Sequence, residues 1–248
     1  MSDFNNGYTR PATATADMSV DAGLRAFMLG VYNKVALGLL VSAALAYLTS
    51  TWPPVRDLMF QQTPEGFSFT LLGMGVAFAP LAILLFSAFA MRNASPRAAS
   101  VIYWGVVALI GASTGLLLLF YTSVSVVTTF LITAAAFGAL SLVGYTTKKD
   151  LSGLGSFLIM GVVGLIIAMI VNMFLQSGVM FLIINALGVL IFAGLIAADT
   201  QRLKLTYYEL GGNQAAMSVA TSYGALSLYL DFINLFRFLL YFLGVRRD

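Results

Sequence analysis

The stretch GALSLYLDFINLFRFLLYFLG, residues 224–244, places an aspartate, Asp231, inside an otherwise apolar run. A helix needs about 20 such residues to cross the hydrocarbon core of a bilayer, so this run predicts a membrane span. An ionised, unpaired carboxylate in hydrocarbon costs several kcal/mol. The Asp231 side chain must therefore hold a proton, face a cation or lie along a wet path. All three solutions point to protons or cations.

The composition extends the membrane interpretation to the whole chain. Of its 248 residues, 60% are hydrophobic and 9% are charged, and the mean hydropathy is +0.92. Water-soluble domains of this size do not have such a composition. The chain has no cysteine, which excludes disulfide and thiol chemistry, and no histidine, which removes the usual proton shuttle and the commonest metal ligand. Proton-linked behaviour near neutral pH must then depend on carboxylates.

We predict three regions: a cytosolic amino-terminal tail at 1–27, one transmembrane domain at 28–243 and a short carboxy-terminal tail at 244–248. The amino-terminal region is polar and lacks the pattern of a cleaved signal peptide. Prolines and charges predict a loop at 51–68, and a second loop of about 15 residues is expected after Lys204. The domain is predicted to be all-α, with seven membrane-spanning helices at 28–50, 69–91, 99–120, 124–145, 155–175, 179–203 and 219–243.

Basic residues predict the orientation, because short loops rich in Lys and Arg stay on the cytoplasmic side. The larger group comprises Arg10, Arg25, Lys34, Arg92, Arg97, Lys148, Lys149, Arg202 and Lys204. The opposite side has Arg56, Arg246 and Arg247. We therefore expect a cytoplasmic amino terminus and a carboxyl terminus on the other side. The Arg246–Arg247 pair is discordant, and a re-entrant last segment would bring it inside; the apolar length of that segment favours a full span. The small net charge of +3 fits contact with lipid headgroups and predicts no nucleic-acid binding.

Helical geometry gives the last segment a polar stripe. At about 100° per residue, one face within about 60° carries Gly224, Ser227, Asp231 and Asn234. Because the remaining surface is apolar, the stripe must face protein or water, which predicts a central position for this helix.

The sixth segment carries the second candidate carboxylate, Asp199, near its expected cytoplasmic end. Its predicted buried strip is Asn185, Gly188, Phe192, Leu195 and Asp199. The carboxyl groups of Asp199 and Asp231 could meet if this helix continues past Lys204. Two adjacent carboxylates in a low dielectric do not both ionise easily, so such a pair would share a proton and act as a pH sensor.

Other interpretations of these residues remain open at this point. Asp199 could be an interfacial residue at a helix end beside Arg202 and Lys204, and Asp231 could be a structural residue held by Asn234 or a hydroxyl. An intramembrane aspartyl protease also needs two aspartates, but the GxGD context is missing around both. A proton-coupled transporter would show interrupted helices around a substrate site. We expect no enzyme and no cofactor.

Three stretches resemble the Bax inhibitor-1 (TMBIM) family. SLYLDFINLF at 227–236 is similar to the signature of the family's last helix, AADTQRLK at 197–204 to the end of its sixth helix, and KKDLS at 148–152 to the approach to its fifth. The seven-span layout agrees, and the resemblance covers all but about the first 20 residues.

The resemblance implies a central seventh helix enclosed by two three-helix layers. In bacterial members it implies a calcium leak in the inner membrane, governed by pH through two aspartates, here Asp199 and Asp231. These two residues would then form only a weak, transient calcium site, because tight sites need six to eight oxygens. It also implies a latch on Asp199 by an arginine at the end of the second helix, where FAMR places Arg92. Arg92 otherwise fits a positive-inside anchor. A different function implied by relatives is a non-catalytic regulator that binds a membrane protease or a cell-death or stress partner.

Overall fold

Helices make up nearly all of the part of the chain that the structure describes. The computed structural model describes residues 22–64, 66–90 and 95–247, so most of the predicted amino-terminal tail, and Arg92, lie outside the described residues. The elements in chain order are α1 (Ala22–Thr51), α2 (Pro53–Met59), β1 (Phe60–Thr63), β2 (Gly66–Phe69), α3 (Leu71–Ala90), α4 (Pro96–Phe120), α5 (Ser123–Thr146), α6 (Ser152–Leu175), α7 (Gly178–Glu209) and α8 (Gln214–Leu243).

The long helices correspond to the seven predicted spans. Six of them, α1, α4, α5, α6, α7 and α8, are long and apolar enough to cross a membrane, and α3 contains a shorter apolar helix, Leu71–Ser87. The prediction of an all-α membrane protein is thus confirmed, apart from one small hairpin. Helix α1 begins at Ala22, within the residues assigned to the tail.

Polar caps explain where several of these helices begin. The side-chain oxygens of Ser95, Thr122, Ser177 and Asn213 each accept a hydrogen bond from the backbone N–H three residues later, at the start of α4, α5, α7 and α8. Such bonds satisfy backbone donors that have no partner within the helix. Short connections with capping residues therefore turn the chain directly from one span into the next.

Two predicted loops are more ordered than expected. Residues 51–68 include helix α2 and the antiparallel strands β1 and β2, in which Phe60 pairs with Phe69 and Thr63 with Gly66. The prolines start α2, because proline suits the first helical turn, and Gly66 adopts a φ of 123° that glycine tolerates. The prolines thus mark the start of helix α2, and Gly66 marks the turn between β1 and β2.

The prediction of a loop of about 15 residues after Lys204 is wrong. Helix α7 continues to Glu209 and the connection is only 210–213, where Gly211 and Gly212 have positive φ. Falling hydropathy marks the edge of the apolar run, whereas the helix ends at the first residues that favour a left-handed backbone.

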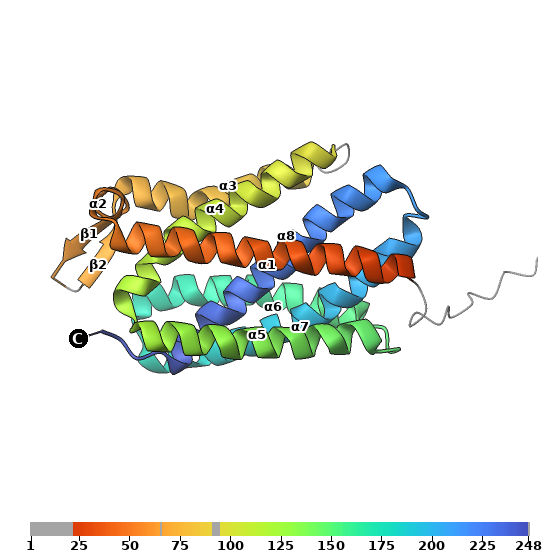
Figure 1. Cartoon of the computed structure of the whole chain (residues 1–248). Coiled ribbons are helices and arrows are strands. Elements are labelled where there is room, and N and C mark those ends of the chain that lie inside the picture. Colours follow the sequence, from red (N-terminus) through yellow and green to blue (C-terminus); the bar gives the residue numbers. More distant parts are fainter. Residues whose placement is uncertain (1–21, 65, 91–94, 248) are drawn as a thin grey trace, which may run out of the picture.

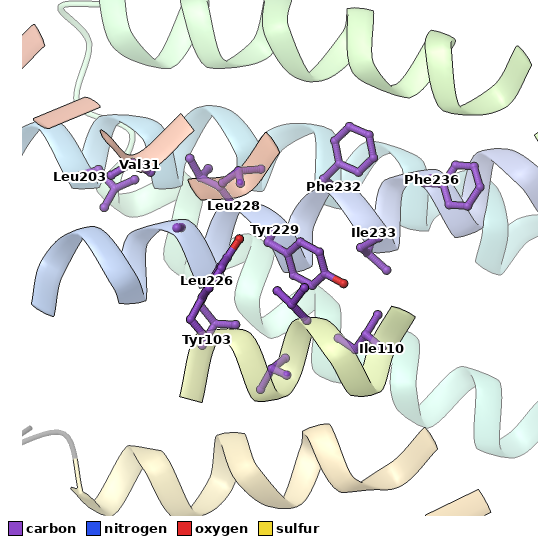
Figure 2. Close-up of a cluster of buried hydrophobic side chains, with 14 of the residues drawn as sticks. Val31, Tyr103, Ile110, Leu203, Leu226, Leu228, Tyr229, Phe232, Ile233 and Phe236 are labelled. Atoms are coloured by element: carbon purple, nitrogen blue, oxygen red, sulfur yellow. The ribbon is translucent and has the colours of Figure 1, made fainter. Parts of the chain in front are cut away.

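Helix α8 lies in the interior of the bundle. It packs against α1, α4, α5 and α7, and a larger share of it is buried than of any other span. Figure 1 shows α8 crossing obliquely behind α1. Its core side chains include Leu228, Tyr229 and Phe232, which pack with Tyr103 of α4 and Val31 of α1 (Figure 2). This interior position agrees with the prediction for the polar last helix, while its enclosure by two three-helix layers stays a prediction.

The last helix crosses the bundle from end to end. Its first turns lie beside α1, where Ser222 accepts a hydrogen bond from Lys34 at 2.7 Å. Its far end leads to a tail that pairs with the α4–α5 connection, through Thr122 N to Val245 O at 3.0 Å and Arg247 N to Phe120 O at 2.8 Å. The described carboxyl end and the start of α1 thus lie at opposite ends of the bundle (Figure 1). This geometry fits a full span better than a re-entrant segment, and the side on which the tail emerges stays a prediction.

Candidate functional site

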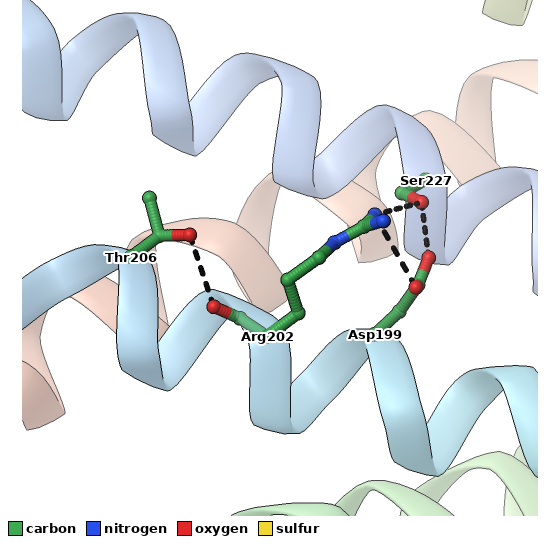
Figure 3. A network of polar contacts seen from close by, with 4 residues as sticks. All are labelled: Asp199, Arg202, Thr206 and Ser227. Atoms are coloured by element: carbon green, nitrogen blue, oxygen red, sulfur yellow. Dashed lines mark hydrogen bonds and ion pairs between the residues drawn. The ribbon is translucent and has the colours of Figure 1, made fainter. Parts of the chain in front are cut away.

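Asp199 of α7 lies in a polar ring with Arg202 and with Ser227 of α8. Its Oδ2 accepts a short hydrogen bond from the Ser227 hydroxyl, and its Oδ1 forms an ion pair with Nη2 of Arg202 at 3.2 Å. The same Nη2 donates to Ser227 Oγ at 3.2 Å, which closes the ring (Figure 3). The ring joins α7 to α8.

Helix geometry accounts for this arrangement. Residues three apart lie on the same side of a helix, which brings Arg202 to Asp199. Asp199 is only 8% exposed, whereas the Arg202 side chain is 57% exposed, so the carboxylate is inside and the guanidinium lies at the rim. One turn further along α7, Thr206 donates a hydrogen bond to the Arg202 carbonyl at 3.0 Å (Figure 3).

Asp231 lies one turn beyond Ser227 on α8 and is 6% exposed. The side chain of Asp199 lies within hydrogen-bonding reach of it, and Arg202 contributes a positive charge. Oδ2 of Asp231 nevertheless has no hydrogen-bond partner in the described part of the chain. The two carboxyl groups are therefore brought together in unequal surroundings, since Asp199 directly contacts a guanidinium and a hydroxyl, whereas Asp231 Oδ2 has no partner among the described residues.

The remaining members of the predicted stripe differ in their contacts. A Cβ atom at Gly224 would lie 2.3 Å from Leu203 Cδ2, so the glycine allows α8 to approach α7. Asn234 is half-buried, and within the described residues no hydrogen bond joins it to Asp231. The alternative in which Asn234 holds Asp231 therefore has no support from the geometry.

The predicted strip on α7 is buried, and Asp199 is not at a helix end. Asn185, Phe192 and Leu195 are each at most 7% exposed, and α7 runs ten residues past Asp199. The interpretation of Asp199 as a residue at a helix end is therefore wrong, although its proximity to Arg202 is confirmed.

Two further α7 side chains hold the α5–α6 connection and were missed from the sequence. Gln201 accepts a hydrogen bond from Leu151 N and donates one to Lys149 O, both at 2.7 Å. Lys204 donates to the Tyr145 carbonyl at 2.8 Å, near the end of α5, where a cation favours the helix dipole. Gln201 lies within the predicted span 179–203 and Lys204 just beyond it, and the signal for both was their polar type at the end of an apolar run.

Several buried hydroxyl groups lie on the helices around the aspartate pair. The Tyr32 phenol of α1 lies beside Ser141 of α5 and Thr200 of α7. The hydroxyl oxygens of Ser141, Thr200 and Tyr223 are buried and, like Asp231 Oδ2, lack hydrogen-bond partners among the described residues. Buried polar atoms normally have partners, and the Tyr32 phenol is close enough to supply one to Ser141 and Thr200, so the capacity to bind water or an ion belongs to Tyr223 Oη and Asp231 Oδ2.

The oxygen ligands fit a weak cation site better than a tight one. Within the described ranges no group of three or more Asp, Glu, His or Cys residues is placed to hold a metal ion. Asp199, Asp231 and neighbouring hydroxyls could contact a hard cation in transit, but a tight calcium site requires six to eight oxygens.

Fold and site together define a multi-pass membrane protein with a buried carboxyl pair between two of its spans. The family model described as "Inhibitor of apoptosis-promoting Bax1" matches residues 24–248. A protein of Caulobacter vibrioides is 63% identical over the full length of both chains. The protein RP147 of Rickettsia prowazekii is 41% identical over 97% of this chain and 99% of its own. Inner membrane protein YbhL of Escherichia coli K12 is 35% identical over 91% of this chain and 94% of its own. The chain belongs to the Bax inhibitor-1 family and is an integral inner-membrane protein.

Proposed function

We propose that this protein is a pH-gated leak pathway for calcium or similar cations, with Asp199 and Asp231 as its proton sensor and gate. The observation that carries the proposal is the buried Asp231 carboxyl group, which faces Asp199 within a membrane span and has one oxygen without a partner. Ionisable groups inside membrane spans are costly, and they commonly mark ion or proton pathways. The unpartnered hydroxyls around the pair support a polar route beside it.

The polar ring suggests how a proton would act. Ionised Asp199 attracts Arg202 and accepts the Ser227 hydrogen bond, which together tie α7 to α8. Because Asp231 lies against Asp199 in a low dielectric, the two carboxyl groups behave as one proton-binding unit. A proton on Asp199 removes the charge that attracts Arg202 and weakens the tie. A difference of a few kcal/mol is enough to shift the bundle between closed and open populations.

Among the described residues, the cation that pairs with Asp199 is Arg202, and this is the kind of contact expected of the predicted latch. Arg92 itself lies outside the described residues. The latch role of Arg92 therefore stays a prediction, and Arg92→Ala belongs in the same experiment.

The proposal is tested with the purified protein in liposomes loaded with a calcium dye, from mildly acidic to mildly alkaline pH. Wild-type flux should rise as the pH falls. Asp199→Asn should leak at every pH because its side chain cannot ionise, and Asp231→Asn should lose the pH dependence. Asp150→Asn is the matched control, because Asp150 is an exposed acid in the α5–α6 connection, and it should keep the wild-type profile.

Two outcomes separate the parts of the proposal. Flux equal to that of protein-free vesicles would refute the leak pathway and leave the partner-binding regulator, which should keep its cellular function in Asp231→Asn. Flux that is present but unaffected by pH and by both aspartate changes would refute the sensor.

A further inference from the structure

A cavity of about 260 Å³ lies at the end of the bundle where α4 ends and α5 begins. Side chains from α1, α4, α5 and the carboxy-terminal tail line it, including Tyr47, Leu118, Ser123, Val127 and Arg247. Tyr47 and Val127 are 65% and 58% exposed, so the cavity adjoins a surface that faces lipid in a membrane. It is far from the aspartate pair along α8 and takes no part in the proposed gate.

The tail that supplies Arg247 is fixed to the bundle. Its backbone bonds to Thr122 and Phe120 are joined by one from Val245 N to Ser125 Oγ at 3.0 Å, and Arg246 forms an antiparallel bridge with Tyr121. The Arg247 guanidinium donates to Ser123 Oγ at 3.2 Å. In the described part of the chain, neither arginine forms an ion pair with an acid. A positive charge is thus held at the cavity by the four described tail residues, 244–247, and no described acid pairs with it.

Three features at the Arg247 end of the cavity favour the binding of an oxyanion. Arg247 offers a planar donor group that suits phosphate, Ser123 adds a hydroxyl, and α5 begins at Ser123, so the positive end of its dipole faces the same place. The apolar walls, such as Leu118 and Val127, suit the glycerol and upper acyl part of an amphiphile.

We propose that this cavity binds the headgroup region of an anionic phospholipid from the adjoining leaflet, with Arg247 and Ser123 on the phosphate. The site gives a role to Arg247, one member of the Arg246–Arg247 pair that is discordant with the charge distribution of the other loops. The occupant is a lipid and not a free anion, because the charged end and the apolar walls belong to one cavity that adjoins the lipid-facing surface.

The test is retention of lipid by the purified full-length protein in native mass spectrometry. Phosphatidylglycerol should be retained in preference to phosphatidylcholine with the same acyl chains. Arg247→Gln should weaken retention about tenfold, the effect of losing one charged hydrogen bond. Arg246→Gln is the matched control, because it removes the same charge from an exposed neighbour that does not line the cavity, and it should retain lipid as the wild type does.

A second variant keeps both arginines and fills the cavity. Val127→Trp should abolish selective retention while the protein keeps its thermal unfolding temperature, because Val127 is largely exposed. Asp248, next in the sequence, lies outside the described residues, and Asp248→Asn should keep or strengthen retention. Equal retention of both lipids, equal loss in the two arginine variants, or displacement by inorganic phosphate would overturn the proposal.

Discussion

The side chains of Asp199 and Asp231 lie beside each other in space, but their different surroundings make them contribute differently to the stability of the fold. Asp199 has its charge matched by Arg202 and its hydrogen bond supplied by Ser227. Asp231 is almost fully buried, and one of its oxygens has no partner among the described residues. A buried carboxylate that has hydrogen-bond and ionic partners contributes to folding stability. A buried carboxylate without them lowers folding stability, which suggests that it is kept for its function.

This difference predicts unequal effects of the two amide substitutions on stability. Asp199→Asn should lower the free energy of unfolding by about 1–2 kcal/mol, because it removes the ion pair and weakens the buried hydrogen bond. Asp231→Asn should change it by less than about 0.5 kcal/mol or stabilise the protein, because Oδ2 has no described partner to lose and the new amide can still donate a hydrogen bond to Asp199. Thermal unfolding of the purified variants near neutral pH measures both. An equal loss in the two variants would instead assign Asp231 a structural hydrogen-bonding role.

The residues of the site were only partly predictable from the sequence. The period of 3.6 residues was enough to place Ser227 and Asp231 on one face, and the spacing of three could have identified Arg202 as the partner of Asp199. The meeting of Asp199 with Ser227 was not predictable, because it depends on the relative rotation of α7 and α8. Packing sets that rotation, as at the contact between Gly224 and Leu203.

At the scale of helices, small residues decide how closely the spans approach. A Cβ atom at Gly144 of α5 would lie 2.2 Å from the carbonyl oxygen of Ala197 on α7, two residues before Asp199. Membrane helices associate through such close packing, because lipid gives them no hydrophobic reason to do so. Gly144 therefore helps to set the position of the helix that carries Asp199.

Gly144→Ala should accordingly destabilise the protein by about 1–3 kcal/mol, because the added methyl group forces α5 and α7 apart. Gly138→Ala is the matched control on the same helix, since a Cβ atom there would meet nothing within 4 Å. It should be neutral or stabilise by up to about 1 kcal/mol through helix propensity. Thermal unfolding distinguishes the two, and a similar small effect of both would show that the α5–α7 contact is not tight.

The limits of sequence interpretation are also visible in the elements. The seven apolar runs were recognisable because immersion in lipid demands length and apolarity. The extension of α7 to Glu209 was missed, because Lys204 is a charged residue whose partner is the Tyr145 carbonyl near the end of α5 and not only water. Local hydropathy contains no information about such a distant partner.

The whole molecule is asymmetric from end to end. The α5–α6 connection, with exposed Lys148, follows the end of α5, and the carboxy-terminal tail lies at the α4–α5 connection, where α5 begins. A helix of 24 residues separates these two regions. If α5 crosses the bilayer, as its length and apolarity predict, these two regions emerge on opposite sides, and the positive-inside rule predicts that Lys148 is cytoplasmic.

This sidedness can be tested directly, because the chain contains no cysteine and a single introduced thiol has no background. Val245→Cys should react with a membrane-impermeant maleimide in intact spheroplasts, since Val245 is 63% exposed at the end predicted to lie outside. Lys148→Cys should react only after the membrane is opened. Both side chains are exposed, so a difference in labelling reports the side of the membrane and not burial. The reverse pattern would invert the orientation and place the cavity at Arg247 in the cytoplasmic leaflet. Labelling of both variants in intact spheroplasts would show that α5 does not cross the bilayer.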